Sequence, residues 1–351
     1  MSAAGWFRLL ARNRFSIAPS RWGMAAVISL FAPCNVFFSL LQQARYGRRI
    51  RETALADDPV FVIGHWRSGT TYLHELLVRD PKFTYPNTYD VFSPNHFLAS
   101  APVIKPWTRY LLPATRPMDN VATGWERPQE DEFALCNLGL RSPYLTIAFP
   151  NRPQDEEYLD LAGISDATLA QWKERFLGFL KCLTVRSPKR IVLKSPPHTA
   201  RLRVLSELFP RARFIHMVRD PYVLFPSTIN LWSALYRDHG LQVAPFEGLQ
   251  ERVFSTFCRM YEAFERDRPR VPAGRIADVR YEDLVADPLA EVERLYGELD
   301  LGDFAAARPT LEPYVAQQRE YKTNRYEIAP ELRREISQRW RGYFERYGYD
   351  V

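Results

Sequence analysis

The sequence predicts an α/β fold with three layers, in which helices cover both faces of a central parallel sheet. Two observations carry this prediction. An apolar run at residues 60–63 reads as a buried strand and leads through a short turn into a segment with helical apolar spacing. Further along, apolar runs at 190–194 and 213–218 bracket a helix-like segment at 199–209. Two strands joined by one helix form a βαβ unit, whose strands are parallel.

The turn after the first strand has the composition of a phosphate-binding loop. Gly69 lets the backbone pass close to an anion, and the first N–H groups of the following helix point at it with the helix dipole behind them. Arg67 and the hydroxyls of Ser68, Thr70 and Thr71 supply further donors. The alternative is an ordinary strand-to-helix turn with a capping hydroxyl.

The loop differs from that of nucleoside-triphosphate enzymes, which ends in Gly-Lys-Ser/Thr. Here Gly69 is followed by two threonines, and the cation precedes it as Arg67. Arg-Ser-Gly-Thr-Thr resembles the 5′-phosphosulfate loop of sulfotransferases that use 3′-phosphoadenosine 5′-phosphosulfate (PAPS). The arginine is similar to the bacterial, carbohydrate and tyrosylprotein branches of that family, whereas the cytosolic branch usually has lysine.

Charged residues also follow the later strands. Lys194 ends one strand, and Arg219 follows the next, with Ser227 eight residues later. Ligands of open α/β sheets bind at this carboxyl edge. Arg219 and Ser227 match the 3′-phosphate motif of sulfotransferases, and Lys194 matches the lysine that ends an earlier strand in that family. The resemblance therefore implies PAPS as co-substrate. Taken alone, Arg219 could instead form a surface ion pair and have no role in binding phosphate.

Two later segments agree with this resemblance. Residues 275–296 read as a strand, a Tyr-Glu-Asp-Leu turn and a helix, a block similar to one in sulfotransferases, for which we expect a structural role. Lys322 and Arg325 lie in a basic segment, and sulfotransferases often close the nucleotide site with a late basic loop. A solvated linker before an amphipathic helix at 330–347 is the alternative.

The resemblance implies roles for these residues. Sulfuryl transfer, by analogy with phosphoryl transfer, needs groups held in line and charge on the leaving phosphate neutralised. We expect Arg67 and the loop N–H groups to hold the 5′-phosphate, and Lys194 to follow the charge that develops on the bridging oxygen. No acidic cluster of the kind that holds Mg²⁺ follows the strands, and the cysteines and histidines lack zinc-site spacing, so no metal is expected.

The sequence leaves the catalytic base open. The cytosolic branch has a histidine two residues after the strand-end lysine, but Pro196 stands there, and His198 comes two residues later. Other branches use a glutamate beyond the phosphate loop, where residues 84–96 offer only Asp90 and His96.

The acidic run at residues 130–132 supplies another candidate base. Acids at a helix start interact favourably with the helix dipole, so capping is the simpler interpretation. The alternative is that Glu130 or Glu132 faces the acceptor as general base. We rank Glu130 first, then His198, then Asp90.

Positive charge is concentrated at the start of the chain. Residues 1–51 contain eight arginines, no lysine and no acid, whereas the whole chain of 351 residues has 47 basic and 41 acidic residues. The remainder is therefore nearly neutral. The basic arm lacks the interleaved aromatic and polar readers of a nucleic-acid-binding face, so nucleic acid is not expected as a partner.

Between its arginines, the arm carries an uncharged apolar segment at residues 22–41, interrupted by Pro33 and Asn35. Three interpretations remain open: a monotopic insertion beneath a basic collar, a spanning helix, or a helix buried against the globular body. We expect a membrane-seeking helical arm that contacts the membrane through residues 1–51. The expected location is cytoplasmic, peripheral or monotopic at the inner face of the membrane.

The sequence thus predicts an N-terminal arm at 1–57 and a P-loop-like sulfotransferase domain at 58–351, with an acceptor-site insertion at 85–185. The expected reaction moves a sulfuryl group from PAPS to a hydroxyl or amine of a lipid or other amphipathic small molecule. Two alternatives stay open: a P-loop phosphotransferase, and a non-catalytic membrane-bound nucleotide-binding adaptor. The oligomeric state stays open as well.

Overall fold

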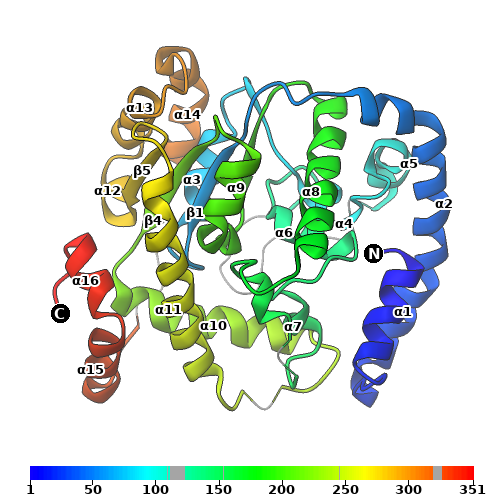
Figure 1. Ribbon diagram of the computed structural model, residues 1–351, viewed down its shortest axis with the longest axis horizontal. Coiled ribbons are helices and arrows are strands. Elements are labelled where there is room, and N and C mark those ends of the chain that lie inside the picture. The colour runs from blue at the N-terminus through cyan, green and yellow to red at the C-terminus, as the bar shows by residue number, and fades with distance from the viewer. Residues whose placement is uncertain (109, 111–122, 153, 245, 319–325) are drawn as a thin grey trace. The chain divides into compact units, whose positions relative to one another are not determined.

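The computed structural model describes residues 1–108, 110, 123–152, 154–244, 246–318 and 326–351 (Figure 1). These residues form two compact units. The first unit contains Met1–Ala56, Tyr85–Ile191 and Trp232–Pro245, and the second contains Asp57–Thr84, Val192–Leu231 and Phe246–Val351.

The second unit is built on a five-stranded sheet. Its strands are β1 (Val60–Gly64), β2 (Phe83–Thr84), β3 (Arg190–Lys194), β4 (Arg213–Val218) and β5 (Ile276–Arg280). Their order is β2-β3-β1-β4-β5, with β1 parallel to β3 and β4, and β4 parallel to β5. The predicted central parallel sheet is therefore confirmed, and the short edge strand β2 is an addition that the sequence did not predict.

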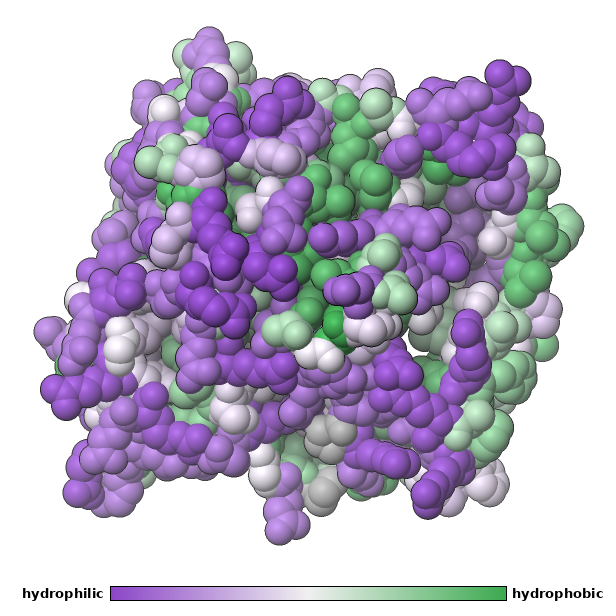
Figure 2. Space-filling view, viewed as in Figure 1, coloured by the Kyte–Doolittle hydropathy of each residue, from purple (hydrophilic) through white to green (hydrophobic). Residues whose placement is uncertain are grey.

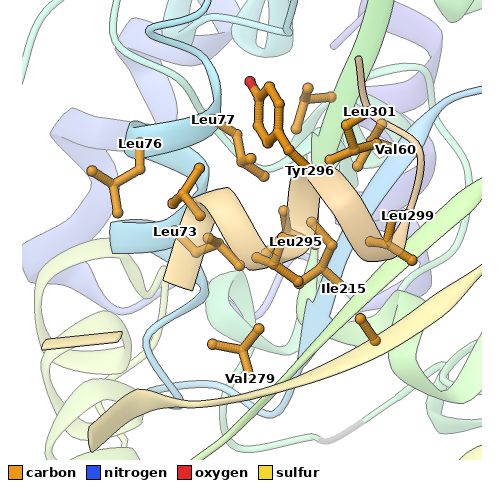
Figure 3. Close-up of a cluster of buried hydrophobic side chains, with 14 of the residues drawn as sticks. Val60, Leu73, Leu76, Leu77, Ile215, Val279, Leu295, Tyr296, Leu299 and Leu301 are labelled. Atoms are coloured by element: carbon orange, nitrogen blue, oxygen red, sulfur yellow. The ribbon is translucent and has the colours of Figure 1, made fainter. Parts of the chain in front are cut away.

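Helices cover both faces of this sheet because its strands are apolar on both sides. On one face, Val60 and Ile215 pack against α3 (Thr70–Leu77), α13 (Pro288–Glu298) and α14 (Phe304–Gln318), in the cluster shown in Figure 3. On the other face, Phe61 packs against Phe209, which follows α9 (Leu202–Leu208), and α11 (Leu249–Asp267) lies alongside α9. This is the predicted three-layer arrangement.

The remaining elements are helical. In the first unit they are α1 (Ala3–Arg12), η1 (Pro19–Arg21), α2 (Trp22–Glu52), α4 (Thr88–Phe92), α5 (Phe97–Thr108), α6 (Asp131–Asn137), α7 (Leu145–Ala148), η3 (Glu156–Tyr158) and α8 (Asp166–Arg186). In the second they are η4 (Pro196–Arg201), η5 (Arg268–Arg270), α12 (Tyr281–Ala286), α15 (Pro330–Arg339) and α16 (Arg341–Tyr347). The helix α10 (Pro221–His239) belongs to the second unit up to Leu231 and to the first from Trp232 on.

Two predicted helices differ from those observed. The apolar segment of the arm forms one helix, α2, that continues through Pro33 to Glu52, and with η1 it is long and apolar enough to cross a membrane. The expected helix at 330–347 breaks at Trp340, whose backbone leaves helical geometry. The reason is tertiary packing: the indole of Trp340 is buried and stacks on Phe257, with ring centroids 3.7 Å apart.

Candidate active site

The turn between β1 and α3 depends on two glycines with positive φ. Gly64 has φ +139°, and a Cβ there would lie 2.6 Å from the carbonyl oxygen of Met217. Gly69 caps α3 with φ +99°, and its Cβ would lie 2.3 Å from Cδ2 of Tyr281. Neither position has room for a side chain, so the glycines let the loop pass directly over β4 and Tyr281.

Hydrogen bonds within the loop hold its shape. The N–H and the hydroxyl of Ser68 both donate to the carbonyl of His65, at 3.1 and 2.7 Å. Where β1 ends, the N–H of Gly64 donates to the hydroxyl of Thr199 at 2.7 Å. Beyond the turn, Thr70 and Thr71 open α3, and the first N–H groups of a helix have no acceptor within it. This end of α3 therefore offers donors and a positive dipole to an anion.

The structure brings together residues that the sequence placed in separate motifs. Arg67 donates through Nε to the hydroxyl of Ser227 at 2.9 Å. Arg219 donates through Nη1 to the carbonyl oxygen of Arg67 at 2.9 Å, and its guanidinium lies over the ring of Tyr281, 4.0 Å from the centroid. We call Arg67, Arg219 and Ser227 the arginine clamp. It joins the loop to the start of α10.

Lys194 lies at the same edge of the sheet. It ends β3 and pairs in register with Val62 of β1, two residues before Gly64. On the other side of β1, β4 ends immediately before Arg219. Lys194, the loop and Arg219 thus follow the carboxyl ends of three adjacent parallel strands, where ligands of open α/β sheets bind. The side chain of Lys194 is buried, so its charge is carried in a region of low dielectric.

The loop histidine adds no positive charge to this edge. His65 is buried beside Phe257, and desolvation lowers its pKa to about 3. The imidazole is therefore neutral at physiological pH. Positive charge in the loop and clamp comes from Arg67 and Arg219.

Two tyrosines contribute to the site in ways the sequence did not reveal. Tyr281, which belongs to the block at residues 275–296 for which we expected a structural role, touches both Gly69 and Arg219. Tyr343 of α16 accepts a hydrogen bond from the N–H of Arg219 at 3.1 Å and donates to its carbonyl at 3.4 Å. Burial raises the pKa of Tyr343 well above its usual value, so the hydroxyl keeps the proton it donates. No local pattern links residues 124 positions apart.

Glu130 and Glu132 occupy different environments in the first unit. Glu130 is the N-cap residue of α6, half-buried, and accepts a hydrogen bond from the hydroxyl of Tyr144. Tyr144 in turn packs against Phe133 and Trp232. Glu132 is fully buried and accepts from Ser142. The helix start expected for this acidic run is present, and Glu130 is the more accessible of the two carboxylates.

The other candidate bases are held in local contacts. Asp90 completes a capping box with Asn87 and pairs with Arg186, while His96 bonds to Ser100. In the second unit, His198 is fully buried and its ring meets Phe61 edge-on, with centroids 5.6 Å apart. Lys322 and Arg325 lie outside the described residues. Among the residues that the structure does describe, no group of three or more His, Cys, Asp or Glu side chains is placed to hold a metal ion.

A model of the family described as "Sulfotransferase family" matches residues 59–305, which include the loop, Lys194, Arg219 and Ser227. The chain belongs to the sulfotransferase family. This sulfotransferase is 46% identical over 348 residues to omega-hydroxy-beta-dihydromenaquinone-9 sulfotransferase Stf3 of Mycobacterium tuberculosis, covering 99% of the chain and 89% of that protein. It is 25% identical to human carbohydrate sulfotransferase 6, over 73% of the chain and 66% of that protein.

Solved sulfotransferase structures share the fold. The crystal structure of sulfotransferase STF9 from Mycobacterium avium superposes with a TM-score of 0.71 at 19% identity, covering 90% of this chain and 82% of the other. For sulfotransferase STF1 from Mycobacterium tuberculosis the TM-score is 0.59 at 20% identity, with 90% and 87% covered. The resemblance, the fold class and the enzyme class expected from the sequence are confirmed. The phosphotransferase and adaptor alternatives are set aside by the same matches.

Proposed function

We propose that this sulfotransferase uses PAPS as donor and transfers its sulfuryl group to a hydroxyl on a membrane lipid. The observation that carries the donor assignment is the arginine clamp, in which Arg67 of the loop bonds Ser227 and Arg219 bonds the carbonyl of Arg67. A site with two adjacent cationic ends suits a nucleotide with phosphate at both its 5′ and 3′ positions.

Each end of the clamp has a distinct proposed task. Arg67, with the N–H groups at the start of α3, holds the 5′-phosphosulfate, and the hydroxyls of Ser68, Thr70 and Thr71 line that end of the loop. Arg219 and Ser227 hold the 3′-phosphate, with Tyr281 supporting the guanidinium. Lys194, at the end of β3, stabilises negative charge as it develops on the bridging oxygen of the leaving phosphate.

We propose Glu130 as the general base that takes the proton of the acceptor hydroxyl. Its carboxylate is half-buried at the N-terminus of α6 and is oriented by the hydroxyl of Tyr144, as a base needs to be. Phe133 and Trp232, which pack on Tyr144, place apolar surface beside it. His198 ranks below Glu130 because its ring is enclosed against Phe61, and Asp90 because Arg186 already neutralises it.

The acceptor class follows from the relative that is 46% identical over nearly the whole chain, whose name states a hydroxylated menaquinone derivative. We therefore propose, as the acceptor, the terminal hydroxyl of an isoprenoid chain on a quinone-type lipid. An acceptor of this kind resides in a membrane, and the basic apolar arm at residues 1–51 is the proposed membrane contact. The proposed location is the inner face of the membrane.

Titration calorimetry on the full chain tests the donor assignment. Adenosine 3′,5′-bisphosphate is expected to bind about ten- to a hundredfold more tightly than 5′-AMP, since charge-assisted hydrogen bonds contribute about 1.5–3 kcal/mol each. In Arg219→Ala the two affinities should converge. Equal affinities in the unmodified chain would overturn the assignment of Arg219 and Ser227 to the 3′-phosphate.

Tyr343→Phe is expected to weaken adenosine 3′,5′-bisphosphate binding about fivefold and to leave 5′-AMP binding unchanged. The substitution removes a net hydrogen-bond contribution of about 1 kcal/mol that fixes the backbone of Arg219. The matched control is Tyr347→Phe on the same helix as Tyr343. This variant loses a hydrogen bond to Glu265 of α11 and leaves the hydrogen bonds of Arg219 intact. If both variants lower the two affinities alike, Tyr343 has only a structural role.

A further inference from the structure

The helix α2 presents small and polar residues toward its own unit. Ala25 and Ala32 are buried along this side. Ser29 accepts a hydrogen bond from Nε1 of Trp6 at 2.8 Å. Asn35, one of the residues expected to interrupt the apolar segment, instead bonds Nε2 of His96 at 3.2 Å. The interior contact of this helix is therefore made by small side chains and by polar groups, Ser29 and Asn35, of types that are mostly exposed in proteins.

The same contact continues through the C-terminal half of α2. The side-chain oxygen of Gln42 accepts from the N–H of Leu98 at 2.9 Å, and Lys181 donates to the carbonyl of Arg51 at 3.0 Å. These partners belong to α5 and α8 of the same unit. Hence α2 is attached to its unit along most of its length.

The outward side of α2 is apolar. Leu30, Phe37 and Leu40 are 74%, 62% and 67% exposed. Other exposed apolar side chains on this helix are Trp22, Val27, Ile28, Phe31, Val36 and Leu41. Figure 2 shows the resulting hydrophobic strip along the right-hand edge, where Figure 1 places α2. A helix in contact with water has the reverse arrangement, with its apolar stripe facing the core.

The neighbouring helix α5 also carries exposed apolar side chains. It packs on α2, and its Val103 and Trp107, one turn apart, are exposed, with Trp107 at 83%. We call the outward apolar residues of α2, together with these two, the apolar face. Large apolar side chains exposed in this number on two packed helices indicate an interaction site rather than ordinary surface.

The positive charge beside the apolar face indicates which partner the face binds. Residues 1–51 carry eight arginines and no acid, and Arg45, Arg48 and Arg49 are exposed on the last turns of α2, directly beyond the apolar face. An apolar surface with a cationic border complements an anionic bilayer. We propose that the apolar face inserts into an anionic membrane with α2 lying in the plane of the interface. This inference rests on the proposed function only in one respect: binding to the membrane brings the enzyme to a lipid acceptor.

The contacts of α2 favour the in-plane orientation over a spanning one. A spanning helix would have to leave α5 and α8 and would lose the hydrogen bonds made along α2 between positions 29 and 51. It would also place Asn35 near the centre of the hydrocarbon. In the plane, all of these bonds are kept and only the apolar side enters the lipid. The third interpretation, a helix buried against the globular body, is correct in that α2 packs on α5 and α8, and wrong in its burial, because the large apolar side chains of the helix are exposed.

Vesicle flotation of the full chain, without donor or acceptor, tests the inference. The double variant Phe37→Gln/Leu40→Gln is expected to bind phosphatidylcholine–phosphatidylglycerol vesicles about a hundredfold more weakly. Each inserted side chain contributes about tenfold to the affinity. The matched control, Val243→Gln/Val285→Gln, changes two exposed valines outside the face and should bind normally. Arg45→Gln/Arg49→Gln should weaken binding to these anionic vesicles and leave binding to pure phosphatidylcholine unchanged.

A depth measurement separates the two orientations. Cys34 is exposed on α2 and accepts a fluorescent thiol label, with Cys34→Ala giving the background from the other cysteines. Quenching by lipids brominated near the headgroup supports the in-plane helix, and stronger quenching by lipids brominated at the chain end would overturn it. Unchanged vesicle binding in Phe37→Gln/Leu40→Gln would also overturn the proposal. So would the absence of vesicle binding by the unmodified chain and every variant together with a change of oligomeric state in Phe37→Gln/Leu40→Gln, because the apolar face would then bind a second copy of the chain. Transfer to a short water-soluble alcohol reports on the proposed function separately.

Discussion

Lys194→Ala is expected to lower the rate of sulfuryl transfer by about 10²–10³-fold while donor affinity falls much less. The lysine ends β3 at the edge where the loop and Arg219 meet, and its buried charge acts in a region that excludes water. It therefore interacts more strongly with a leaving group that gains charge than with the bound donor. The measurements are kcat from radiolabelled PAPS and Kd of adenosine 3′,5′-bisphosphate from calorimetry.

Two further variants make the Lys194 result interpretable. Lys194→Met keeps the length of the side chain and removes the charge, so it separates a lost charge from a cavity. Lys189→Ala removes an exposed lysine just before the same strand and should leave turnover unchanged. Near-normal turnover in Lys194→Met would remove Lys194 from the mechanism.

Gly69→Ala is expected to destabilise the chain by about 2–4 kcal/mol and to weaken donor binding at least tenfold. A positive φ is unfavourable for alanine, and the new methyl would collide with Tyr281 at 2.3 Å. Relief of that collision moves both the start of α3 and the ring beneath Arg219, so binding at both proposed phosphate sites is weakened. Urea unfolding and calorimetry measure the two effects.

Gly248→Ala is the matched control for this prediction. Gly248 also caps a helix, α11, with φ +74°, but nothing lies within 4 Å of its Cβ position. It should therefore show only the backbone effect, about 1 kcal/mol, with donor binding unchanged. If the two alanine variants behave alike, contact between Gly69 and Tyr281 plays no part in the site.

The predictable part of this fold is the part encoded locally. The runs that became β1, β3 and β4 are apolar on both faces, because helices cover both sides of their sheet. Gly69 and the polar residues around it marked the turn from β1 to α3, since a positive φ at a helix start favours glycine. Arg67, Arg219 and Ser227 were candidate phosphate-binding residues from the sequence, in two separate motifs, but no pattern predicted the bonds between them. Only the fold puts Arg67 2.9 Å from Ser227, 160 positions later.

The unpredicted part depends on packing between distant segments. Tyr343 meets Arg219 through contacts made by α16, and Trp340 ends α15 because its ring stacks on Phe257. In the arm, Asn35 looked like an interruption of an apolar segment. Its partner, His96, lies 61 residues away, and that pairing turns the polar residue inward and the apolar ones outward. A helix with reversed polarity cannot be recognised from its own sequence, which shows periodicity but not direction.

The most direct test of the central assignment is transfer from radiolabelled PAPS to a quinone-type isoprenoid lipid in anionic vesicles. One acceptor carries a terminal hydroxyl on its isoprenoid chain, and a matched acceptor ends in a methyl group. We expect labelled lipid and an equal amount of adenosine 3′,5′-bisphosphate with the hydroxylated acceptor, and neither product with the methyl-terminated one. Release of adenosine 3′,5′-bisphosphate without any labelled acceptor, or no turnover of PAPS with any hydroxylated lipid, would contradict it.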